Sequence, residues 1–218
     1  MRAIIPLKAL DAAKGRLAPD LDPSARRALT AWMFGRVLAA CRGAEHIDGV
    51  LVVAGDEAAG ALARAHAAAA VVEPRPGLDA ALAAADDACA DEAATLVVAA
   101  DLPLARPADL DRVCAVGERP GVVVAPTRDG GTGALLRRPP RAISTRYGPG
   151  SAAAHLALAR AAGVPGLRLD VPALALDIDT AGQLQEAALL DGGLARWLRG
   201  DAGARRGGVL DRAACGDG

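Results

Sequence analysis

Aromatic side chains are scarce in this sequence, where tryptophan, tyrosine and phenylalanine make up 2% of the 218 residues. Proteins that hold single-stranded nucleic acid usually stack the bases on aromatic rings, so the scarcity argues against that kind of ligand. The formal net charge is only −1, and no strong overall field would therefore draw the chain to DNA or to anionic lipid. Recognition of a phosphate group would have to depend on a local arrangement of residues.

Closely spaced cysteines and long apolar runs are also missing. The four cysteines stand far apart and form no C-x-x-C pair: Cys41, Cys89, Cys114 and Cys215. We expect them to be free thiols in a reducing compartment, because neither they nor the three histidines have the spacing of zinc ligands. No stretch approaches the roughly 20 apolar residues of a transmembrane helix, and the first apolar run lacks the features of a signal peptide. These features predict a cytoplasmic protein.

Hydrophobic residues, by contrast, make up 52% of the chain, which is enough to build the core of one good-sized α/β domain. Short β-branched or apolar runs predict strands at 2–6, 50–53, 70–72, 95–99, 122–125, 134–137 and 167–169. Amphipathic segments rich in alanine and leucine predict helices at 23–41, 57–66, 78–90, 107–116, 151–162 and 180–190. Asp22-Pro23 and the pair Asp179-Thr180 provide start signals for the first and last of these helices.

Strands that alternate with helices at this spacing indicate an α/β fold, a single-domain three-layer sandwich around a mostly parallel sheet. The glycine-rich stretch "APTRDGGTGALLRRPP" interrupts the alternation and predicts a short β insertion near the ligand-binding edge. We expect residues 1–199 to form the domain. Residues 200–218 are polar and rich in glycine, and we expect them to be a flexible tail.

Three cations follow the first predicted strand in "LKALDAAKGRLAP", namely Lys8, Lys14 and Arg16. Open α/β sheets bind ligands outside the carboxyl ends of their strands, so this position favours a phosphate-binding role. A solvated surface loop explains a basic cluster of this size equally well when the cluster is considered alone.

Three carboxylates stand at comparable positions. Asp101 ends the apolar run "TLVVAAD", and Asp177 and Asp179 in "LALDIDT" would share one face of an extended segment. Mg²⁺ prefers one or two carboxylates together with phosphate oxygens and water. Taken singly, Asp101 would also suit a turn and Asp179 a helix cap.

Two glycine-rich stretches predict a second ligand pocket, "RDGGTGALL" and "STRYGPGSAAAHL". Thr132 offers a hydroxyl beside glycines whose backbone amides an anion could approach closely. Gly148 and Ser151 precede a predicted helix whose free amides and dipole would attract a phosphate or carboxylate, and Arg146 could add charge. The alternative for the second stretch is a turn followed by a serine N-cap.

The loop after the first predicted strand lacks two common phosphate-binding motifs, which limits the possible types of phosphate chemistry. It matches neither G-x-x-x-x-G-K-[ST] nor G-x-G-x-x-G, which disfavours Walker-type NTPases and dinucleotide-binding folds. No Ser/His/Asp or Cys/His arrangement with a familiar spacing points to acyl transfer. A metal beside a basic loop fits nucleotidyl transfer, which needs positioning and charge neutralisation more than a protein nucleophile.

In chain order, the segments "PLKALDAAKGRLAP", "RPGLDAAL", "ADLPL", "GGTGALL", "RYGPGSAAAH" and "LDIDT" resemble the 2-phospho-L-lactate or phosphoenolpyruvate guanylyltransferases. These enzymes act in coenzyme F-420 biosynthesis, and their fold is similar to that of the molybdenum-cofactor guanylyltransferases and other nucleotide-diphospho-sugar transferases. The resemblance spans residues 5 to about 185. Single motifs such as "DLPL" are unspecific, but six in the same order are strongly indicative.

The resemblance implies a role for each matching residue and a reaction in which the acceptor phosphate attacks GTP and pyrophosphate leaves. Mg²⁺ would be held by Asp101, Asp177 and Asp179. The phospho-acid acceptor would be bound by Thr132, Gly148 and Ser151, with Arg146 nearby. The triphosphate would be held by Lys8, Lys14 and Arg16, which with Asp101 are the expected catalytic residues. The nucleotide would lie near Gly77 and Asp79 of "GLDAAL".

Two positions depart from the family pattern, which usually has asparagine in place of Asp79 and often a polar residue in place of Gly133. The favoured acceptor is phosphoenolpyruvate, with 2-phospho-L-lactate as the other choice. Transfer to molybdopterin or a sugar phosphate would call for an "LAGG"-like first loop, and a non-catalytic nucleotide-binding protein would call for a broken acid set. No nucleic-acid or membrane partner is expected; a homodimer and hand-off of the product to a downstream transferase stay open.

Overall fold

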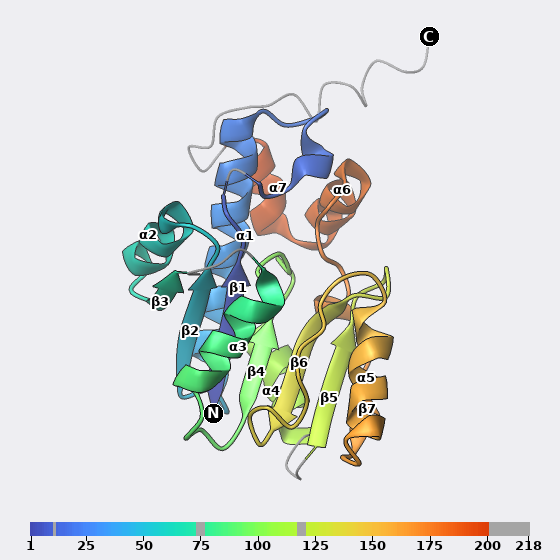
Figure 1. The fold of residues 1–218 in the computed structure, drawn as a ribbon. Coiled ribbons are helices and arrows are strands. Elements are labelled where there is room, and N and C mark those ends of the chain that lie inside the picture. Colours follow the sequence, from blue (N-terminus) through green and yellow to red (C-terminus); the bar gives the residue numbers. More distant parts are fainter. Residues whose placement is uncertain (11, 73–76, 117–120, 201–218) are drawn as a thin grey trace.

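The computed structural model describes residues 1–10, 12–72, 77–116 and 121–200, and Figure 1 shows their fold. Of the expected tail at 200–218, residues 201–218, including Cys215, lie outside the described residues. Over the described ranges, no helix combines the length and the apolar character needed to cross a membrane. The three cysteines within these ranges are free and buried, as the sequence predicts.

A mixed sheet of seven strands forms the centre of the described part of the chain, in the order β3-β2-β1-β4-β6-β5-β7. Every strand runs parallel to the others except β6, which is antiparallel to both of its neighbours. The predicted β insertion is therefore the β5–β6 pair, and it lies within the sheet. The strand bounds are β1 Arg2–Leu7, β2 Gly49–Ala54, β3 Ala69–Val72, β4 Thr95–Val98, β5 Gly121–Pro126, β6 Thr132–Arg138 and β7 Gly166–Arg168.

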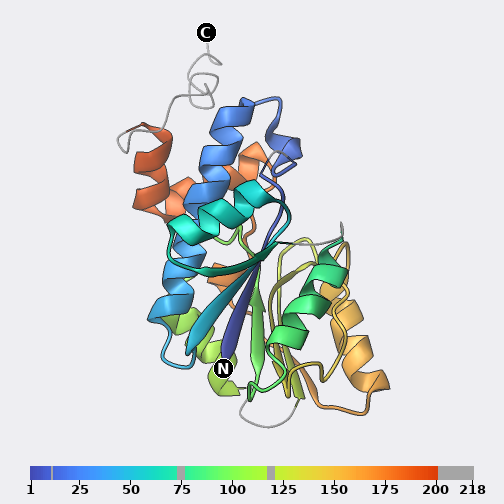
Figure 2. The same ribbon diagram turned by 60° about the vertical axis from the view of Figure 1, so that its left-hand side comes forward.

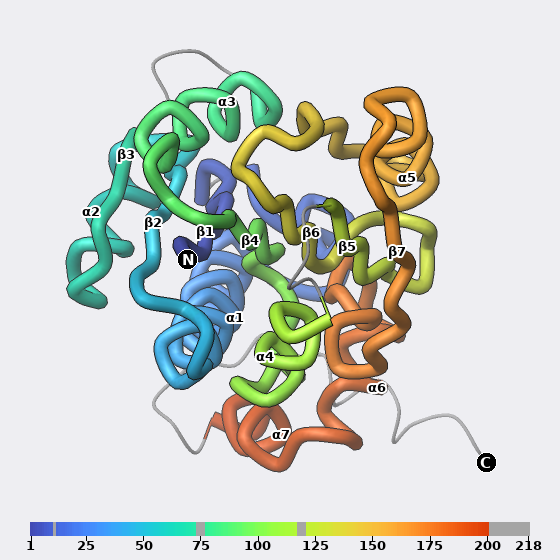
Figure 3. The backbone as a smooth tube through the Cα atoms, turned by 90° about the horizontal axis from the view of Figure 1, so that it is seen from below, coloured from blue at the N-terminus to red at the C-terminus, as the bar shows by residue number. Residues whose placement is uncertain are grey.

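Helices cover both faces of this sheet, which confirms the three-layer architecture (Figure 3). One face carries α1, α2 and α4, and the other carries α3 and α5. Side chains alternate between the two cores along each strand: Ile5 on β1 packs with the first set of helices, and Ile4 packs with the second. The helix bounds are α1 Pro23–Gly43, α2 Glu57–Ala65, α3 Leu78–Ala88, α4 Pro107–Val116 and α5 Ser151–Ala161.

A third apolar cluster lies beyond the carboxyl ends of the strands and supports one side of the ligand-binding edge (Figures 1 and 2). It joins the first half of α1 to α6 (Ala181–Leu190), α7 (Gly192–Leu198) and the short 3₁₀ helix η1 (Gly15–Leu17). A second 3₁₀ helix, η2 (Pro172–Leu174), comes before the last crossover.

Among the α-helices of the described residues, α7 is the one that the sequence pattern did not predict; the short 3₁₀ helices were not predicted either. The first two residues of α7 are glycines, which have a low helix propensity, so the segment after the Asp191 cap does not look helical. The Asp191 side chain nevertheless caps it by accepting the Leu194 amide at 2.7 Å. Trp197 is buried and its ring centroid lies 6.2 Å from that of Trp32 on α1, so tertiary packing outweighs the poor local propensity.

The antiparallel strand β6 is tied to α3 by a buried ion pair. The two terminal nitrogens of the Arg137 guanidinium donate to the Asp86 carboxylate, at 2.7 and 2.5 Å, and the Arg137 side chain is 0% exposed. Such a bidentate pair is well matched in geometry, but each charge depends on the other because neither has access to water.

We expect Asp86→Ala to lower the free energy of unfolding by about 3–5 kcal/mol, because it leaves a buried guanidinium without its counter-charge. The measurement is equilibrium denaturation in urea. The matched control is Asp87→Ala, since the Asp87 side chain is 76% exposed in its ion pair with Arg141 and such surface pairs contribute at most about 1 kcal/mol. Equal losses in the two variants would contradict a structural role for the buried pair.

Candidate functional site

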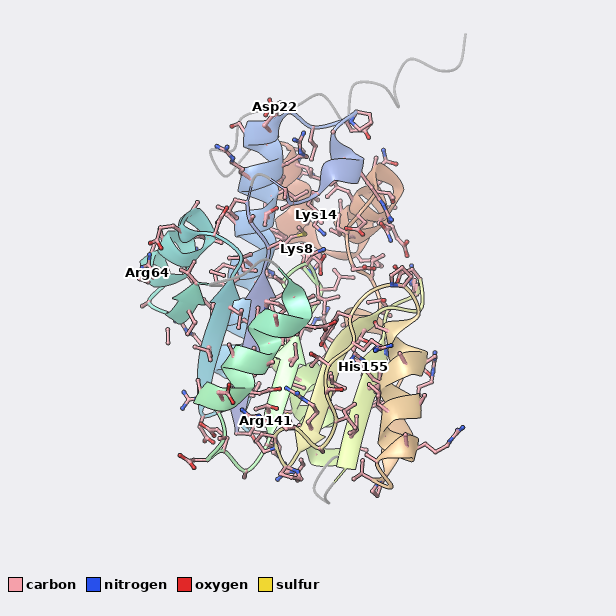
Figure 4. The ribbon with its side chains drawn as sticks, viewed as in Figure 1. Lys8, Lys14, Asp22, Arg64, Arg141 and His155 are labelled. Carbon is pink, nitrogen blue, oxygen red and sulfur yellow. The ribbon has the colours of Figure 1, made fainter. Side chains whose placement is uncertain are left out.

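A cleft of about 740 Å³ opens at the carboxyl ends of β1 and β4. Its walls come from seven separate segments of the chain: the end of β1 with the loop after it, α1, the start of α3, the end of β4, the β5–β6 turn, the start of α5 with the loop before it, and the segment before α6. Parallel strands bring their carboxyl ends to the same edge, which is why residues so distant in sequence meet here. In Figure 4, Lys8 and Lys14 lie above this edge and Arg141 lies at the opposite end of the sheet.

Lys14 is the central cation of the cleft. Its ammonium nitrogen lies 2.6 Å from Asp101 Oδ2 and 3.0 Å from Asp179 Oδ1, and its side chain is 7% exposed. Burial alone would lower the pKa of Lys14, but the two carboxylates outweigh that effect and raise it. The backbone at Lys14 is left-handed, with φ of 57°, which turns the side chain inward at the start of η1.

Asp177 has the opposite character, because it is a carboxylate with too few partners. Its Oδ1 atom is buried and has no hydrogen-bond donor. Burial, followed by the nearby negative charges of Asp101, Asp129 and Asp179, raises the pKa of Asp177 to about 6. A half-buried acid surrounded by other acids favours binding of a cation.

The expected magnesium ligands, Asp101, Asp177 and Asp179, all line the cleft. The buried Oδ1 atom of Asp177 has no hydrogen-bond partner, which suits an atom that would bind a metal ion. Lys14 already stands between Asp101 and Asp179. Within the described ranges, no three acidic, histidine or cysteine side chains are arranged closely enough to form a metal site as they stand. The assignment of Mg²⁺ to these three residues stays a prediction.

The other two predicted cations also reach the cleft. Arg16 lies 3.7 Å from Asp179 Oδ2, with its side chain 75% exposed, and Lys8 lines the opening. The basic cluster is therefore not a simple solvated loop, since one member is buried against carboxylates and all three face a shared cavity.

A pair of hydroxyls, called the hydroxyl pair below, also lines the cleft. Thr132 Oγ1 on β6 lies 2.9 Å from Ser151 Oγ on α5, and both side chains are buried while lining the cleft. The alternative of a serine N-cap is wrong, because Gly150 occupies the N-cap position and Ser151 is the first helical residue. The expectation of free amides is also wrong in part, since Ser151 N donates to Gly148 O and Ala152 N donates to Gly130 O.

Three of the expected site residues do not line the cleft in this structure: Gly77, Asp79 and Arg146. Asp79 instead accepts the Tyr147 amide at 3.1 Å, so its carboxylate helps to fix the "RYGPGS" loop. Gly148 and the neighbouring Tyr147 do line the cleft, so this loop forms one of its edges. A role for Gly77 and Asp79 toward a nucleotide stays a prediction.

Two features of the site escaped sequence analysis. Asp129 lines the cleft, and its side chain accepts hydrogen bonds from Thr127 Oγ1 and from the Gly131 amide. These two bonds lower the pKa of Asp129, so it adds a negative charge to the cleft. The signal was available in "TRDGG", a typical turn in which an aspartate bonds to the backbone two residues on. Gly133 is explained as well, since a Cβ there would lie 2.2 Å from the Leu174 carbonyl oxygen.

We expect Asp177→Asn to stabilise the protein without ligands by on the order of 1 kcal/mol at pH 7, after allowance for solvent screening. The folded-state pKa lies above the unfolded value of 3.8, so the penalty is absent below pH 4, grows between pH 4 and 6 and is complete above 6. Thermal unfolding should show a midpoint about 2–4 °C higher for the variant at pH 7. A gain that stays constant down to pH 4, or no gain at all, would contradict the charge-crowding explanation.

Comparisons with known proteins give this geometry a context. The family model described as "Guanylyl transferase CofC like" matches residues 1–195. The phosphoenolpyruvate guanylyltransferase of Sphaerobacter thermophilus is 38% identical over 189 residues, covering 85% of this chain and 91% of that protein. The 2-phospho-L-lactate guanylyltransferase of Methanothermobacter thermautotrophicus is 37% identical over 191 residues, covering 86% and 83%.

Solved structures support the fold. A putative nucleotide-diphospho-sugar transferase from Desulfovibrio desulfuricans superimposes with a TM-score of 0.71 at 15% identity, covering 98% of this chain and 93% of that chain. The match to a family model over nearly the whole described chain, together with relatives near 40% identity, agrees with the resemblance found in the motifs. This chain belongs to the CofC-like guanylyltransferase family of nucleotidyltransferase enzymes.

Proposed function

We propose that this protein transfers GMP from GTP to the phosphate of a small phosphorylated carboxylic acid, as a step of coenzyme F-420 biosynthesis. Phosphoenolpyruvate is the favoured acceptor, and 2-phospho-L-lactate is the alternative. The relatives named above support the choice of acids. The single observation that carries the proposal is that Lys14, three carboxylates and the Thr132–Ser151 hydroxyl pair all line one cleft.

In the proposed reaction the protein forms no covalent bond to either substrate. An oxygen of the acceptor phosphate forms a bond to the α-phosphorus of GTP, the bond from that phosphorus to the bridging β-oxygen breaks, and pyrophosphate leaves with the electron pair. The product is a diphosphate that joins guanosine to the acid. Positioning of the two anions and neutralisation of their charge are then the main requirements.

The basic side of the cleft suits the triphosphate. Lys14, Arg16 and Lys8 all line the cleft and together bring three positive charges to it. The burial of Lys14 strengthens its interactions, since a charge in a low-dielectric site acts more strongly than one in water. Asp101, Asp177 and Asp179 would hold Mg²⁺, which when bound supplies positive charge to the phosphate oxygens.

The hydroxyl side of the cleft suits the acceptor. Thr132 and Ser151 line the same cavity as Lys14, and their hydroxyls can donate to an anionic oxygen. The loop at Gly148 borders the same space. In this proposal the triphosphate and the acid bind to different parts of one cleft, as a direct transfer between them requires.

The first test supplies GTP and Mg²⁺ with each acid separately and follows pyrophosphate release. We expect release with phosphoenolpyruvate, and less with 2-phospho-L-lactate or a sugar phosphate at equal concentration. Mass spectrometry of the product should show the guanosine diphosphate diester. Release only with a sugar phosphate or a pterin phosphate, or no release with any acceptor, would overturn the proposal.

The second test is Asp101→Asn, which we expect to lower turnover at least about 100-fold, because it removes a partner of Lys14 and a proposed metal ligand. Folding should be nearly unchanged, since this side chain is 29% exposed and adds little to the core. The matched control is Asp91→Asn, an exposed position before the amino end of the same strand, β4, where full activity is expected. Wild-type turnover by the Asp101 variant would show that the acid cluster has another purpose.

A further inference from the structure

His155 on α5 has no role in the proposed reaction so far, although it contacts the Thr132–Ser151 hydroxyl pair through Thr132. Its side chain is completely buried and lies one helical turn beyond Ser151, on the same face of α5. The Tyr147 ring packs against it edge-on, with the ring centroids 5.2 Å apart. Figure 4 shows His155 beside the sheet, below the cleft.

Both ring nitrogens of His155 have defined partners. The backbone N–H of Arg146 lies 2.9 Å from Nε2, and Thr132 Oγ1 lies 3.1 Å from Nδ1. A backbone N–H can only donate, so Nε2 must be the unprotonated nitrogen. Burial, and then the nearby Arg137 charge, lower the pKa of His155 to about 4, so the ring is neutral at pH 7. The single ring proton therefore sits on Nδ1 and is donated to Thr132.

The direction of that bond decides what the two hydroxyls can offer to a ligand. Thr132 and Ser151 have two protons between them, and the bond that joins them uses one. If Nδ1 were an acceptor, the second hydroxyl proton would be donated to the ring, and Thr132 and Ser151 would present only lone pairs to the cleft. Because Nδ1 is a donor, the second proton is left for the cleft, whichever of the two hydroxyls carries it.

We propose that His155 is a positioning residue that sets the Thr132–Ser151 pair as a hydrogen-bond donor to an anionic oxygen of the acceptor. The chain of donors runs from the Arg146 amide through the ring to the hydroxyls and ends at the phosphate or carboxylate of the bound acid. The "RYGPGS" loop thus reaches the acceptor through its backbone, although the Arg146 side chain does not line the cleft. This inference rests on the proposed function for the identity of the acid.

A pair of substitutions separates the two ends of the ring. The amide of Asn can place its nitrogen near the position of Nδ1 and keep the donor to Thr132, whereas Gln can place its oxygen near Nε2 and keep the acceptor for Arg146. We expect His155→Gln to weaken phosphoenolpyruvate binding about 10- to 100-fold, the effect of losing one hydrogen bond to a charged group. His155→Asn should restore most of the binding, and the affinity for GTP should be unchanged in both variants.

The experiment combines calorimetric titration of phosphoenolpyruvate and GTP with ¹⁵N NMR of the imidazole in the ligand-free wild-type protein. The chemical shifts should show a protonated Nδ1 and an unprotonated Nε2 at pH 7. A protonated Nε2 would overturn the inference, and so would equal acceptor affinity in the Gln variant or an equal loss of GTP affinity. None of these readouts requires turnover, so failure of the proposed reaction is seen separately, as absent pyrophosphate release by the wild-type protein.

Discussion

The arrangement of the cleft depends on one contact, the ammonium group of Lys14 held between Asp101 and Asp179. It joins the loop after β1 to the end of β4, 87 residues away, and to the segment before α6, 165 residues away. Without a cation at this point, the carboxylates of Asp101, Asp177, Asp179 and Asp129 would face one another at the edge of a largely apolar sheet. This contact lies beside the third apolar cluster, because η1 begins directly after Lys14 and α6 begins two residues after Asp179.

The charge balance of the site is incomplete, and this has a structural cost. Lys14 satisfies two carboxylates, whereas the buried oxygen of Asp177 is left without a partner. A site that binds phosphates and a metal ion must keep partly buried charged groups, and their burial lowers the stability of the folded protein. Stability and function therefore make opposing demands on Asp177. The hydroxyl pair differs from the acid cluster, since Thr132, Ser151 and His155 are neutral and hydrogen-bonded to one another.

Much of the fold could be predicted from the chain because strands and helices alternate and their boundaries carry local signals. Asp22 and Thr180 cap α1 and α6 as expected. The helix α7 could not be predicted, because its glycine pair argues against a helix, and the Asp191 cap and the packing against Trp32 that favour one are recognised only in the folded structure. For the site, motif order brought together Lys14, Asp101, Asp179, Thr132 and Ser151. The roles of Asp129 and His155 depend on distances across the fold that a sequence does not contain, and Gly133 is understood only once the Leu174 carbonyl is seen beside it.

The central claim is that one cleft holds both substrates, the triphosphate against Lys14 and the acid against the hydroxyl pair. A crystal structure with phosphoenolpyruvate and the α,β-methylene analogue of GTP, which cannot be cleaved at the relevant bond, tests this claim most directly. The account predicts an acceptor phosphate oxygen about 3–3.5 Å from the α-phosphorus, in a geometry ready for attack, with Lys14 on the triphosphate and Ser151 or Thr132 on the acid. Either ligand bound outside the cleft, or the acid bound on the Lys14 side with the hydroxyl pair empty, would contradict it.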